Sequence, residues 1–590
     1  MTSGWVSPGE VVQSDVVVSS NVTGTAYWTA NNTYHLDGGV FVEPGATLHI
    51  EAGTVVKGMP GQGEESSYLC VAKGAQIFAE GTADAPIIFT FEADPLDGST
   101  PLTTRGQWGG LIVLGEAGLN STPGVSSIEG IPTNVPFGQY GGDNDADNSG
   151  VITYVSIRHG GTEIGAGNEI NGFTLGGVGS GTTINNVEVI ANADDGIEFF
   201  GGTVSIQNAM VAGVGDDSYD YDEGWRGQLN SNWVAVASSD DGDRGGEHDG
   251  GTDPETAQPY ATPTITYATF VGRGVDAGKR ALTFRDNAGG NYSNSVFFNY
   301  ARGVDVEDLS EGEDSYSRFL SGDLTFTNNV VDCGSNTFVT SQGEDLSEYF
   351  NANGNSTSSD HGLTWSPSAV SLAGRADWAS WTLAMTSGWV SPGEVVQSDV
   401  VVSSNVTGTA YWTANNTYHL DGGVFVEPGA TLHIEAGTVV KGMPGQGEES
   451  SYLCVAKGAQ IFAEGTADAP IIFTFEADPL DGSTPLTTRG QWGGLIVLGE
   501  AGLNSTPGVS SIEGIPTNVP FGQYGGDNDA DNSGVITYVS IRHGGTEIGA
   551  GNEINGFTLG GVGSGTTINN VEVIALSLIH ISEPTRPLYI

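Results

Sequence analysis

Cysteine, basic side chains and long apolar runs are all scarce in this chain of 590 residues. Its three cysteines, Cys70, Cys333 and Cys454, form no Cys-x-x-Cys pair, which excludes a disulfide framework and a cysteine zinc site. Because Lys and Arg total only 18, the chain lacks the basic patches that bind phosphates, and nucleic acid is excluded as a partner. No apolar stretch approaches the length of about 18 residues that predicts a membrane span.

Acidic residues, in contrast, are abundant. Asp and Glu total 71, so the formal net charge is −53 at pH 7. A surface this acidic repels anionic membranes and suits a salty medium, in which ions screen its self-repulsion. It also favours the binding of divalent cations. Hydrophobic residues make up 38% of the chain and aromatic residues 9%, a composition that argues against a disordered protein.

The second half of the chain repeats the first. Residues 1–191 recur letter for letter as residues 385–575, at an offset of 384 residues. Tandem repeats normally diverge at surface positions, where substitution costs little, so this identity indicates either a very recent duplication or an assembly error. The chain end, which reads LSLIHISEPTR from position 576, resembles a translated sequencing adapter. Residues 576–590 are therefore excluded from the interpretation of the fold.

Short strands bounded by glycine dominate the sequence pattern. In GATLHIEAGT (45–54), apolar residues alternate at period two, which is typical of a half-buried strand. Asp pairs that begin at Asp194, Asp216 and Asp240 are spaced by 22 and 24 residues, which predicts a solenoid with rungs of about 22–24 residues. The same spacing separates three asparagines, which we expect in the left-handed backbone of tight turns: Asn186, Asn208 and Asn232.

Several segments resemble one known fold family. WGGLIVLG, NSGVITYVSIRHGG, ADDGIEFFGG and DSYDYDEGWRG are similar to the right-handed parallel β-helix of the pectin-lyase-like type. More narrowly, they resemble large secreted or surface-attached proteins of Bacteroidota-like marine bacteria, and the resemblance covers most of residues 35–310. It implies an all-β, right-handed parallel β-helix at an extracellular or outer cell-surface location. MTSGWVSPGE, at the start, has neither the basic start nor the apolar core of a signal peptide.

This resemblance and the repeat predict five segments. We expect an N-terminal strand and cap at 1–34, the β-helix at 35–365, a C-terminal cap at 366–384, a truncated second copy at 385–575 and an artefact tail at 576–590. The C-terminal cap would cover the last open rung of the solenoid. The second copy stops before the acidic rungs, so it would expose an unpaired strand edge.

Acidic residues on successive rungs are the candidate metal ligands. Rungs stack about 4.8 Å apart, so the Asp pairs would align as a column of carboxylates that calcium, protonation or nearby basic residues must neutralise. A loop at 141–150 adds a D-x-D-x-D pattern, which resembles the start of a calcium loop or, alternatively, a plain Asx-rich turn. The calcium hypothesis, with a hydrated acidic face as its alternative, involves these residues: Asp143, Asp145, Asp147, Asp194, Asp216, Asp217, Asp240 and Asp241.

Aromatic residues lie close to these acids in the sequence. Flat amphipathic rings beside carboxylates suit sugar binding, although the same rings could instead brace the rungs. The sugar-stacking hypothesis involves Tyr219, Tyr221, Trp225 and Trp233.

A loose resemblance to the β-helical polygalacturonases suggests catalytic roles. It implies that these residues would be catalytic: Asp195, Asp216, Asp217, His248 and Arg280. The sequence departs from that family, because the histidine lies in GEHDGG and the basic pair is Lys-Arg with no residue between. A hydrolase of the inverting type needs an acid and a base about 6.5–9.5 Å apart. A lyase would instead use calcium to acidify a uronate proton and an Arg or Lys as the base.

The leading functional hypothesis is therefore binding rather than catalysis. It describes a secreted or surface protein, stabilised by calcium, whose partner is a polysaccharide or a cell-surface glycan. The first alternative is a polysaccharide lyase or glycoside hydrolase that acts on acidic polysaccharide in a groove at 194–285. The second alternative is a purely structural surface repeat.

Overall fold

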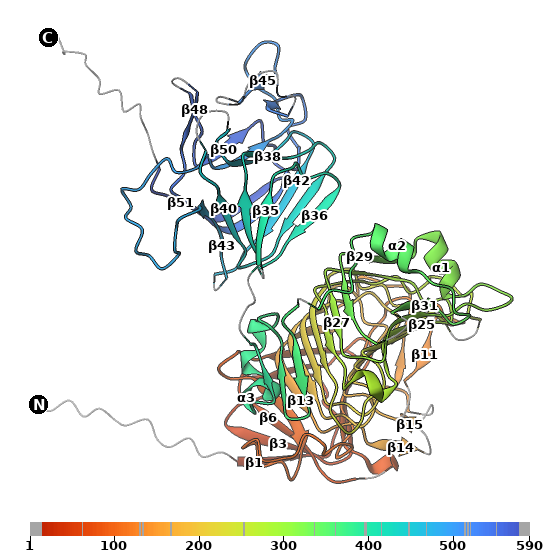
Figure 1. Ribbon diagram of the computed structural model, residues 1–590. Helices are drawn as coiled ribbons and strands as arrows, with labels where there is room; N and C mark the ends of the chain where they lie inside the picture. The colour runs from red at the N-terminus through yellow and green to blue at the C-terminus, as the bar shows by residue number, and fades with distance from the viewer. Residues whose placement is uncertain are drawn as a thin grey trace, which may run out of the picture. The chain divides into compact units, whose positions relative to one another are not determined.

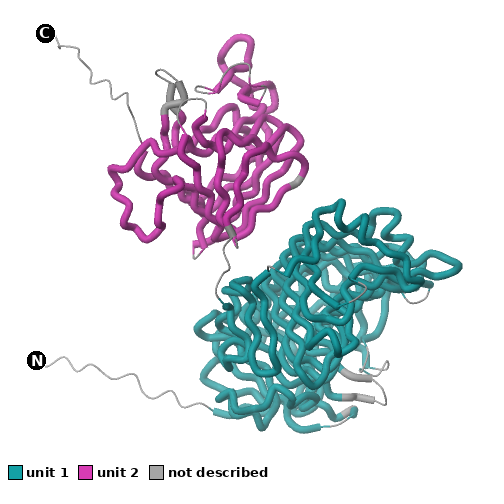
Figure 2. The backbone as a smooth tube through the Cα atoms, viewed as in Figure 1, with its two compact units in different colours: residues 1–394 teal, residues 395–590 magenta. Residues whose placement is uncertain are grey.

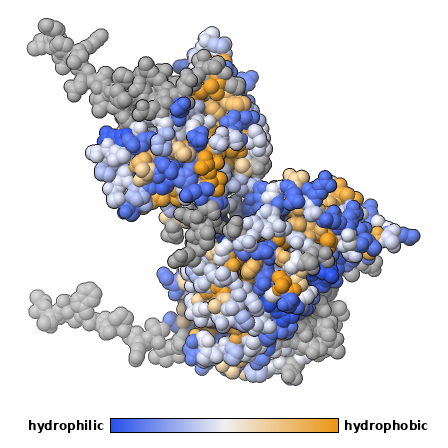
Figure 3. All heavy atoms as spheres, viewed as in Figure 1, coloured by the Kyte–Doolittle hydropathy of each residue, from blue (hydrophilic) through white to orange (hydrophobic). Residues whose placement is uncertain are grey.

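The computed structural model describes most of the chain in two compact units, residues 1–394 and 395–590 (Figure 2). The described residues are 14–61, 63–128, 131, 135–165, 168–251, 254–334, 337–359, 361–393, 398–414, 416–445, 449–467, 469–512, 515, 519, 521–549 and 552–576. The expected entry cap therefore lies partly, and the adapter-like tail almost wholly, outside the described residues. Hydrophilic residues cover much of the visible surface of each unit (Figure 3). Within the described residues, no helix is both long and apolar enough to cross a membrane.

Unit 1 is a parallel β-helix, as the sequence predicts. One parallel sheet stacks one short strand from each rung (Figure 1). In stacking order its strands are β4 (Gly39–Val42), β7 (Tyr68–Val71), β10 (Leu111–Leu114), β16 (Phe173–Gly176), β18 (Ile197–Phe200), β20 (Tyr219–Asp222), β22 (Gly246–Asp249), β25 (Arg280–Arg285), β28 (Arg302–Val306) and β31 (Phe338–Thr340).

The second sheet of unit 1 contains two parallel ladders that join. The long strand β13 (Gly150–Arg158) pairs through its first half with β8 (Gln76–Glu80) and through its second half with β9 (Ile87–Phe91). The other strands of this sheet are β1 (Ser14–Val18), β2 (Thr25–Trp28), β3 (Asn32–Leu36), β5 (Thr47–Ile50), β6 (Val55–Gly58), β17 (Thr183–Ile190), β19 (Ile206–Ala212), β21 (Asn230–Val236), β23 (Thr264–Thr266), β24 (Thr269–Val271), β26 (Gly290–Ser293), β27 (Val296–Phe298), β29 (Leu324–Thr327) and β30 (Val330–Asp332).

Alternation along each strand fills the interior between the sheets. Leu48 and Ile50 of β5 are fully or almost fully buried, while the alternate residues Thr47 and His49 face outward. At the bends, Asn186, Asn208 and Asn232 have φ values of 53–57°, which confirms the predicted left-handed turns. The Asn232 side-chain amide donates to the Asn208 Oδ1 at 2.9 Å, so neighbouring rungs also share side-chain hydrogen bonds.

Short helices and a three-stranded sheet lie near the end of unit 1. The helices are α1 (Ser315–Ser321), α2 (Ser347–Ala352) and α3 (Leu383–Thr386), and the sheet contains β32 (Thr364–Ser366), β33 (Ala369–Ser371) and β34 (Val390–Ser391). Apolar residues of 363–390 pack against the outward-facing apolar residues of β17, β19, β21 and β24. Unit 1 ends at Glu394, ten residues beyond the last residue of the first sequence repeat.

Unit 2 repeats the first part of the same fold. Its smaller sheet contains β38 (Gly423–Val426), β41 (Tyr452–Val455), β44 (Leu495–Leu498) and β50 (Phe557–Gly560). Its larger sheet contains β35 (Ser398–Val402), β36 (Thr409–Trp412), β37 (Asn416–Leu420), β39 (Thr431–Ile434), β40 (Val439–Gly442), β42 (Gln460–Glu464), β43 (Ile471–Phe475), β47 (Gly534–Arg542) and β51 (Thr567–Ile574). β17 is mostly buried, but the identical strand β51 is mostly exposed, because rungs that match β18 and β19 are not part of the repeat.

Candidate functional site

The outer face of β16, β18, β20, β22, β25 and β28 carries a column of polar side chains. Strand register stacks Glu198 on Asp220, and Asp220 on Glu247, so three carboxylates occupy the same position on consecutive rungs. The residues directly before and after each of these carboxylates point into the β-helix, because successive side chains of a strand point to opposite faces. The column continues at both ends with Thr174, Thr283 and Asp305.

A second line of charged groups lies at the turns that lead into these strands. The backbone N–H of Asp217 donates to the Asp195 Oδ1 at 2.8 Å, so these two residues stack as the 22-residue spacing predicts. On the next rung, the stacked position holds Arg244, whose backbone N–H donates to the Asp217 carboxylate. Along the stacked turns, the acidic residues Asp195 and Asp217 are therefore followed by the basic residue Arg244.

The predicted alignment of Asp240 with Asp216 is wrong. Strand β22 follows β20 at a register of 27 residues, because the loop before it is longer than in the preceding rung. The residue above Asp216 is instead Asp243, whose N–H donates to the Asp216 carbonyl at 3.0 Å. Asp240 pairs with Arg105 at 3.0 Å, and this hydrogen-bonded pair lowers its pKa to about 2. Asp241 is exposed in the same loop.

Basic side chains partly neutralise the acids at one end of the face. The Arg244 Nη1 lies 3.0–3.1 Å from carboxylate oxygens of Asp217, Asp243 and Glu247. Arg285 forms a two-point pair with Asp249, at 2.6 and 2.9 Å. Further pairs join Lys279 to Asp243 at 3.0 Å and Arg280 to Asp305 at 2.7 Å. Residues 194–249 contain 13 acids and only two arginines, so negative charge remains in excess.

Burial and crowding make these carboxylates difficult to ionise. Desolvation, followed by repulsion from neighbouring acids, raises the pKa of Asp195 and of Asp220 well above the usual value. The pKa of Asp217 is also raised, because burial and Glu247 outweigh the attraction of Arg244. Desolvation raises the pKa of Asp216 as well. Ionisation of this face therefore opposes folding unless a cation compensates for it.

Three groups of carboxylates are close enough to share a cation. Within each group, one oxygen per residue lies within 4.8 Å of the others. Only oxygen atoms are offered, and the Oδ1 of Asp220 is buried without a hydrogen-bond partner, a donor set that fits a hard divalent cation. The groups are Asp194–Asp195–Asp216, Asp195–Glu198–Asp220 and Asp216–Asp217–Asp243.

One known protein family matches most of the chain. The family model described as a pectate-lyase like beta helix domain matches residues 20–383 and again residues 404–577. The chain belongs to this family. The second match covers most of the truncated copy and ends two residues into the adapter-like tail, at residue 577.

Two similar solved structures are of the same enzyme, an alginate lyase, with and without a mutation. The PL6 family alginate lyase AlyGC is 10% identical with a TM-score of 0.25, and the alignment covers 95% of this chain and 80% of that one. A mutant of the same lyase is 9% identical with a TM-score of 0.21, over 95% of this chain and 77% of that one. No curated protein matches the sequence.

The four aromatic residues proposed to stack on sugars are in the core of the β-helix, so that hypothesis is wrong. Tyr219 and Tyr221 are 1% exposed, and Trp225 and Trp233 are fully buried. Tyr219 and Tyr221 stack above Ile197 and Phe199, which are inward positions of the preceding rung. The alternative interpretation, in which these rings brace the rungs, agrees with their positions.

His248 is also part of the core, which contradicts its predicted catalytic role. Its ring stacks on Tyr221 with centroids 4.0 Å apart, and its Nε2 lies 2.7 Å from the Tyr292 hydroxyl. Complete burial lowers the pKa of His248 to about 3, so the imidazole is neutral and inaccessible to substrate. Of the other predicted catalytic residues, Asp195, Asp216 and Asp217 lie at the turns that lead into β18 and β20, and Arg280 is the first residue of β25. Together with the column Glu198–Asp220–Glu247, these turns form the acidic face.

The D-x-D-x-D loop does not gather its carboxylates. Asp145 pairs with Arg226 at 3.0 Å, while Asp147 is buried and bonded to Ser149. Asp143 is exposed. Among the described residues, the groups that could share a cation include none of these three.

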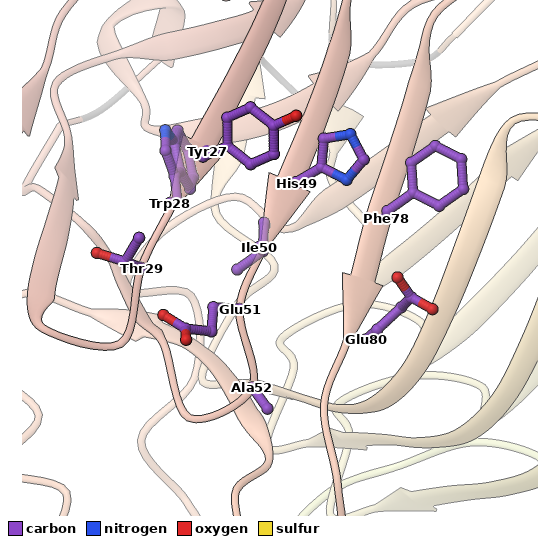
Figure 4. A pocket seen from close by; sticks show the side chains of 9 residues that line it. All are labelled: Tyr27, Trp28, Thr29, His49, Ile50, Glu51, Ala52, Phe78 and Glu80. Carbon is purple, nitrogen blue, oxygen red and sulfur yellow. The ribbon is translucent and has the colours of Figure 1, made fainter.

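An aromatic row that the sequence interpretation missed lies on the outer face of β2, β5 and β8. Tyr27, His49 and Phe78 stack in register, with ring centroids 4.8 and 5.0 Å apart (Figure 4). They border a pocket of about 450 Å³ that Glu51 and Glu80 also line. Tyr27 is 68% exposed, and the row recurs in unit 2. The signal was present in the sequence as aromatic residues at outward positions of consecutive strands.

The raised pKa values predict that unit 1 loses stability as pH increases. Each raised carboxyl stabilises the fold fully below its unfolded pKa of about 3.9, and that contribution is lost as pH rises through the higher folded pKa. In chelator, unit 1 should therefore be less stable near pH 8 than near pH 5. Calorimetry of the full chain can measure this. Unit 2 lacks the acidic rungs and is the internal control, so an equal loss in both units would contradict the prediction.

Proposed function

We propose that this family member binds acidic polysaccharide, through calcium, on the outer face of β18, β20, β22 and β25. The observation that carries the proposal is the set of closely spaced carboxylates, one of which, Asp243, pairs with the partly exposed Lys279. The proposed setting is extracellular or at the outer cell surface, where such polysaccharides occur.

The chemistry of the donor set favours calcium over other cations. Calcium takes six to eight oxygen ligands and tolerates irregular geometry, whereas softer metals prefer nitrogen or sulfur. The residues that would hold it are Asp195, Glu198 and Asp220 in one group, with Asp194 and Asp216 beside them. When bound, calcium would supply positive charge for a sugar carboxylate, and water could complete its ligand shell.

Basic side chains on the same face would position the sugar chain. The side chains of Lys279 and Arg280 are each 33% exposed, and that of Arg285 is 42% exposed, so all three remain accessible despite their ion pairs. An arginine can bind a carboxylate through two parallel hydrogen bonds. A uronate carboxylate could therefore contact a cation in the acidic group and a guanidinium one or two rungs away, about 5–10 Å along the stack.

Asp220→Asn is expected to reduce calcium-dependent binding by about tenfold or more, because it removes a ligand charge with almost no change of shape. Retention of the full chain on immobilised polygalacturonate and alginate, with calcium or with chelator, measures the effect. Asp143→Asn, in an exposed loop, is the matched control. Calcium titration separates the two steps, since Arg280→Gln should weaken polysaccharide retention and leave calcium affinity unchanged. Equal retention by Asp220→Asn and the unsubstituted chain would contradict the proposal.

Cleavage by β-elimination is a second candidate function. It is favoured by the position of Lys279, whose Nζ lies 3.0 Å from Asp243, a member of a possible cation group. An elimination needs the uronate carboxylate neutralised and its C5 proton removed by a base. The C4–O glycosidic bond then breaks, the leaving oxygen takes up a proton, and a double bond remains between C4 and C5 of the sugar. Ultraviolet absorbance of that double bond, lost in Lys279→Ala, would identify a lyase. Retention without such product would leave binding as the function.

A further inference from the structure

The boundary between the two sequence repeats falls inside a helix. The first repeat ends at Ala384 and the second begins at Met385, yet α3 runs from Leu383 to Thr386. Backbone N–H groups of Thr386 and Ser387 donate to the carbonyls of Thr382 and Leu383, both at 2.9 Å. The start of the second repeat is thus folded continuously with the end of the first.

The residues after this helix complete the three-stranded sheet at the end of unit 1. β34 pairs in parallel with β33, through the Val370 N–H to the Trp389 carbonyl at 2.9 Å and the Leu372 N–H to the Ser391 carbonyl at 3.0 Å. The Val390 side chain is 1% exposed. It packs in the apolar cluster that joins residues 363–390 to the outer side of β17, β19, β21 and β24.

Two further contacts hold this segment against the β-helix. The ring of Trp389 lies close to Gly213. A Cβ atom added to Gly213 would lie only 3.4 Å from this ring. The N–H groups of Leu383 and Ala384 donate to the buried Glu188 carboxylate at 2.9 and 2.8 Å. The helix start is therefore fixed to β17, and the tryptophan is fixed near the end of β19.

We infer that the first seven residues of a repeat, Met-Thr-Ser-Gly-Trp-Val-Ser, are a docking strand whose partner is the C-terminal cap of the preceding repeat. Repeats of this kind are then joined because each one completes the fold of its predecessor. The cap that accepts the strand comprises residues 363–384, three residues more than expected from the sequence, and it packs on the side of the β-helix instead of covering the last rung. This cap occurs once in the given sequence, and β34, in residues 385–391, pairs with it. The identical copy at 1–7 lies outside the described residues.

The duplicated sequence provides a matched pair of variants for the test. In the full chain, Trp389→Ala should increase deuterium uptake of the cap by about tenfold or more in rate, because it removes an aromatic contact and loosens β34. Trp5→Ala changes the same residue in the same local sequence and should leave the cap unchanged. Peptides from 363–384 report the result unambiguously, because that sequence is not duplicated.

A truncation gives an independent measurement. Unit 1 has its own core and its own family-model match, so residues 1–394 and 1–384 can be compared directly. We expect the shorter chain to lose protection in the cap and to unfold at a lower temperature. The inference is overturned if Trp5→Ala and Trp389→Ala have the same effect, or if chains 1–384 and 1–394 show equal protection at 363–384.

Discussion

Replacing Arg244 with glutamine is expected to lower the free energy of unfolding of unit 1 by about 3–5 kcal/mol. The Arg244 guanidinium is the shared partner of Asp217, Asp243 and Glu247, and the Asp217 side chain is only 2% exposed. Removing one member of a buried pair leaves an uncompensated charge in a medium that solvates it poorly. Asp217 and Glu247, whose pKa values are already raised, would have to take up protons for unit 1 to stay folded.

Urea unfolding of the full chain can measure this loss, and unit 2, which has no equivalent of Arg244, should unfold as before. Arg226→Gln is the control, because its partner Asp145 is 56% exposed and such surface pairs contribute about 1 kcal/mol or less. The double variant Asp217→Asn/Arg244→Gln should be less destabilised than the sum of the single changes, since both charges of the pair are then removed. An Arg244→Gln effect no larger than that of Arg226→Gln would contradict this account of the acidic face.

The β-helix and its turns could be predicted from the sequence because their signals are local and repeat along the chain. Apolar residues at period two, glycine at the bends and asparagine at left-handed positions each recur with the rungs. The 22-residue spacing also placed Asp195 and Asp217 one above the other correctly. A repeated local rule fixes where each rung bends, and stacking then follows from hydrogen bonding between rungs.

The composition of the acidic face could be predicted only in part. Asp pairs suggested a column through Asp240, but the longer loop before β22 moves Asp243 into that place. Loops between the strands of a solenoid can differ in length while the strands stay paired in register. The sequence spacing of two loop residues therefore does not show whether they stack on each other. The true column, Glu198–Asp220–Glu247, consists of strand residues, whose register is fixed by the buried residues on either side.

The errors on the aromatic residues and on His248 have one cause. Tyr219 and Tyr221 alternate with Asp220, so the period of two puts either the rings or the acid inside, and burial of rings is strongly favoured. The sugar-stacking hypothesis assumed that rings and acids close in sequence lie on the same surface, which this alternation excludes. Applied to β22, the same rule puts Glu247 outside and His248 inside. Partners from distant rungs, such as Tyr292 beside His248, could not be predicted from the local pattern.

Trp225→Ala is expected to destabilise unit 1 by about 3–5 kcal/mol, because it leaves a large cavity in a packed interior. The indole is fully buried and stacks on Phe199 with centroids 3.9 Å apart. Its N–H donates to the Val204 carbonyl at 3.0 Å, and truncation would leave that carbonyl without its partner. The core interpretation predicts this loss in urea unfolding, together with unchanged polysaccharide retention per folded molecule.

Tyr27→Ala is the matched aromatic variant with the opposite expectation. Its ring is 68% exposed in the aromatic row, so its removal should change the stability of unit 1 by about 1 kcal/mol or less. If that row contributes to glycan binding, retention should fall in Tyr27→Ala without a change in unfolding. Reduced retention by fully folded Trp225→Ala, with no loss of stability, would instead restore Trp225 as a sugar-binding residue and contradict its place in the core. The two variants therefore separate an aromatic ring that holds the β-helix together from one that is available to a ligand.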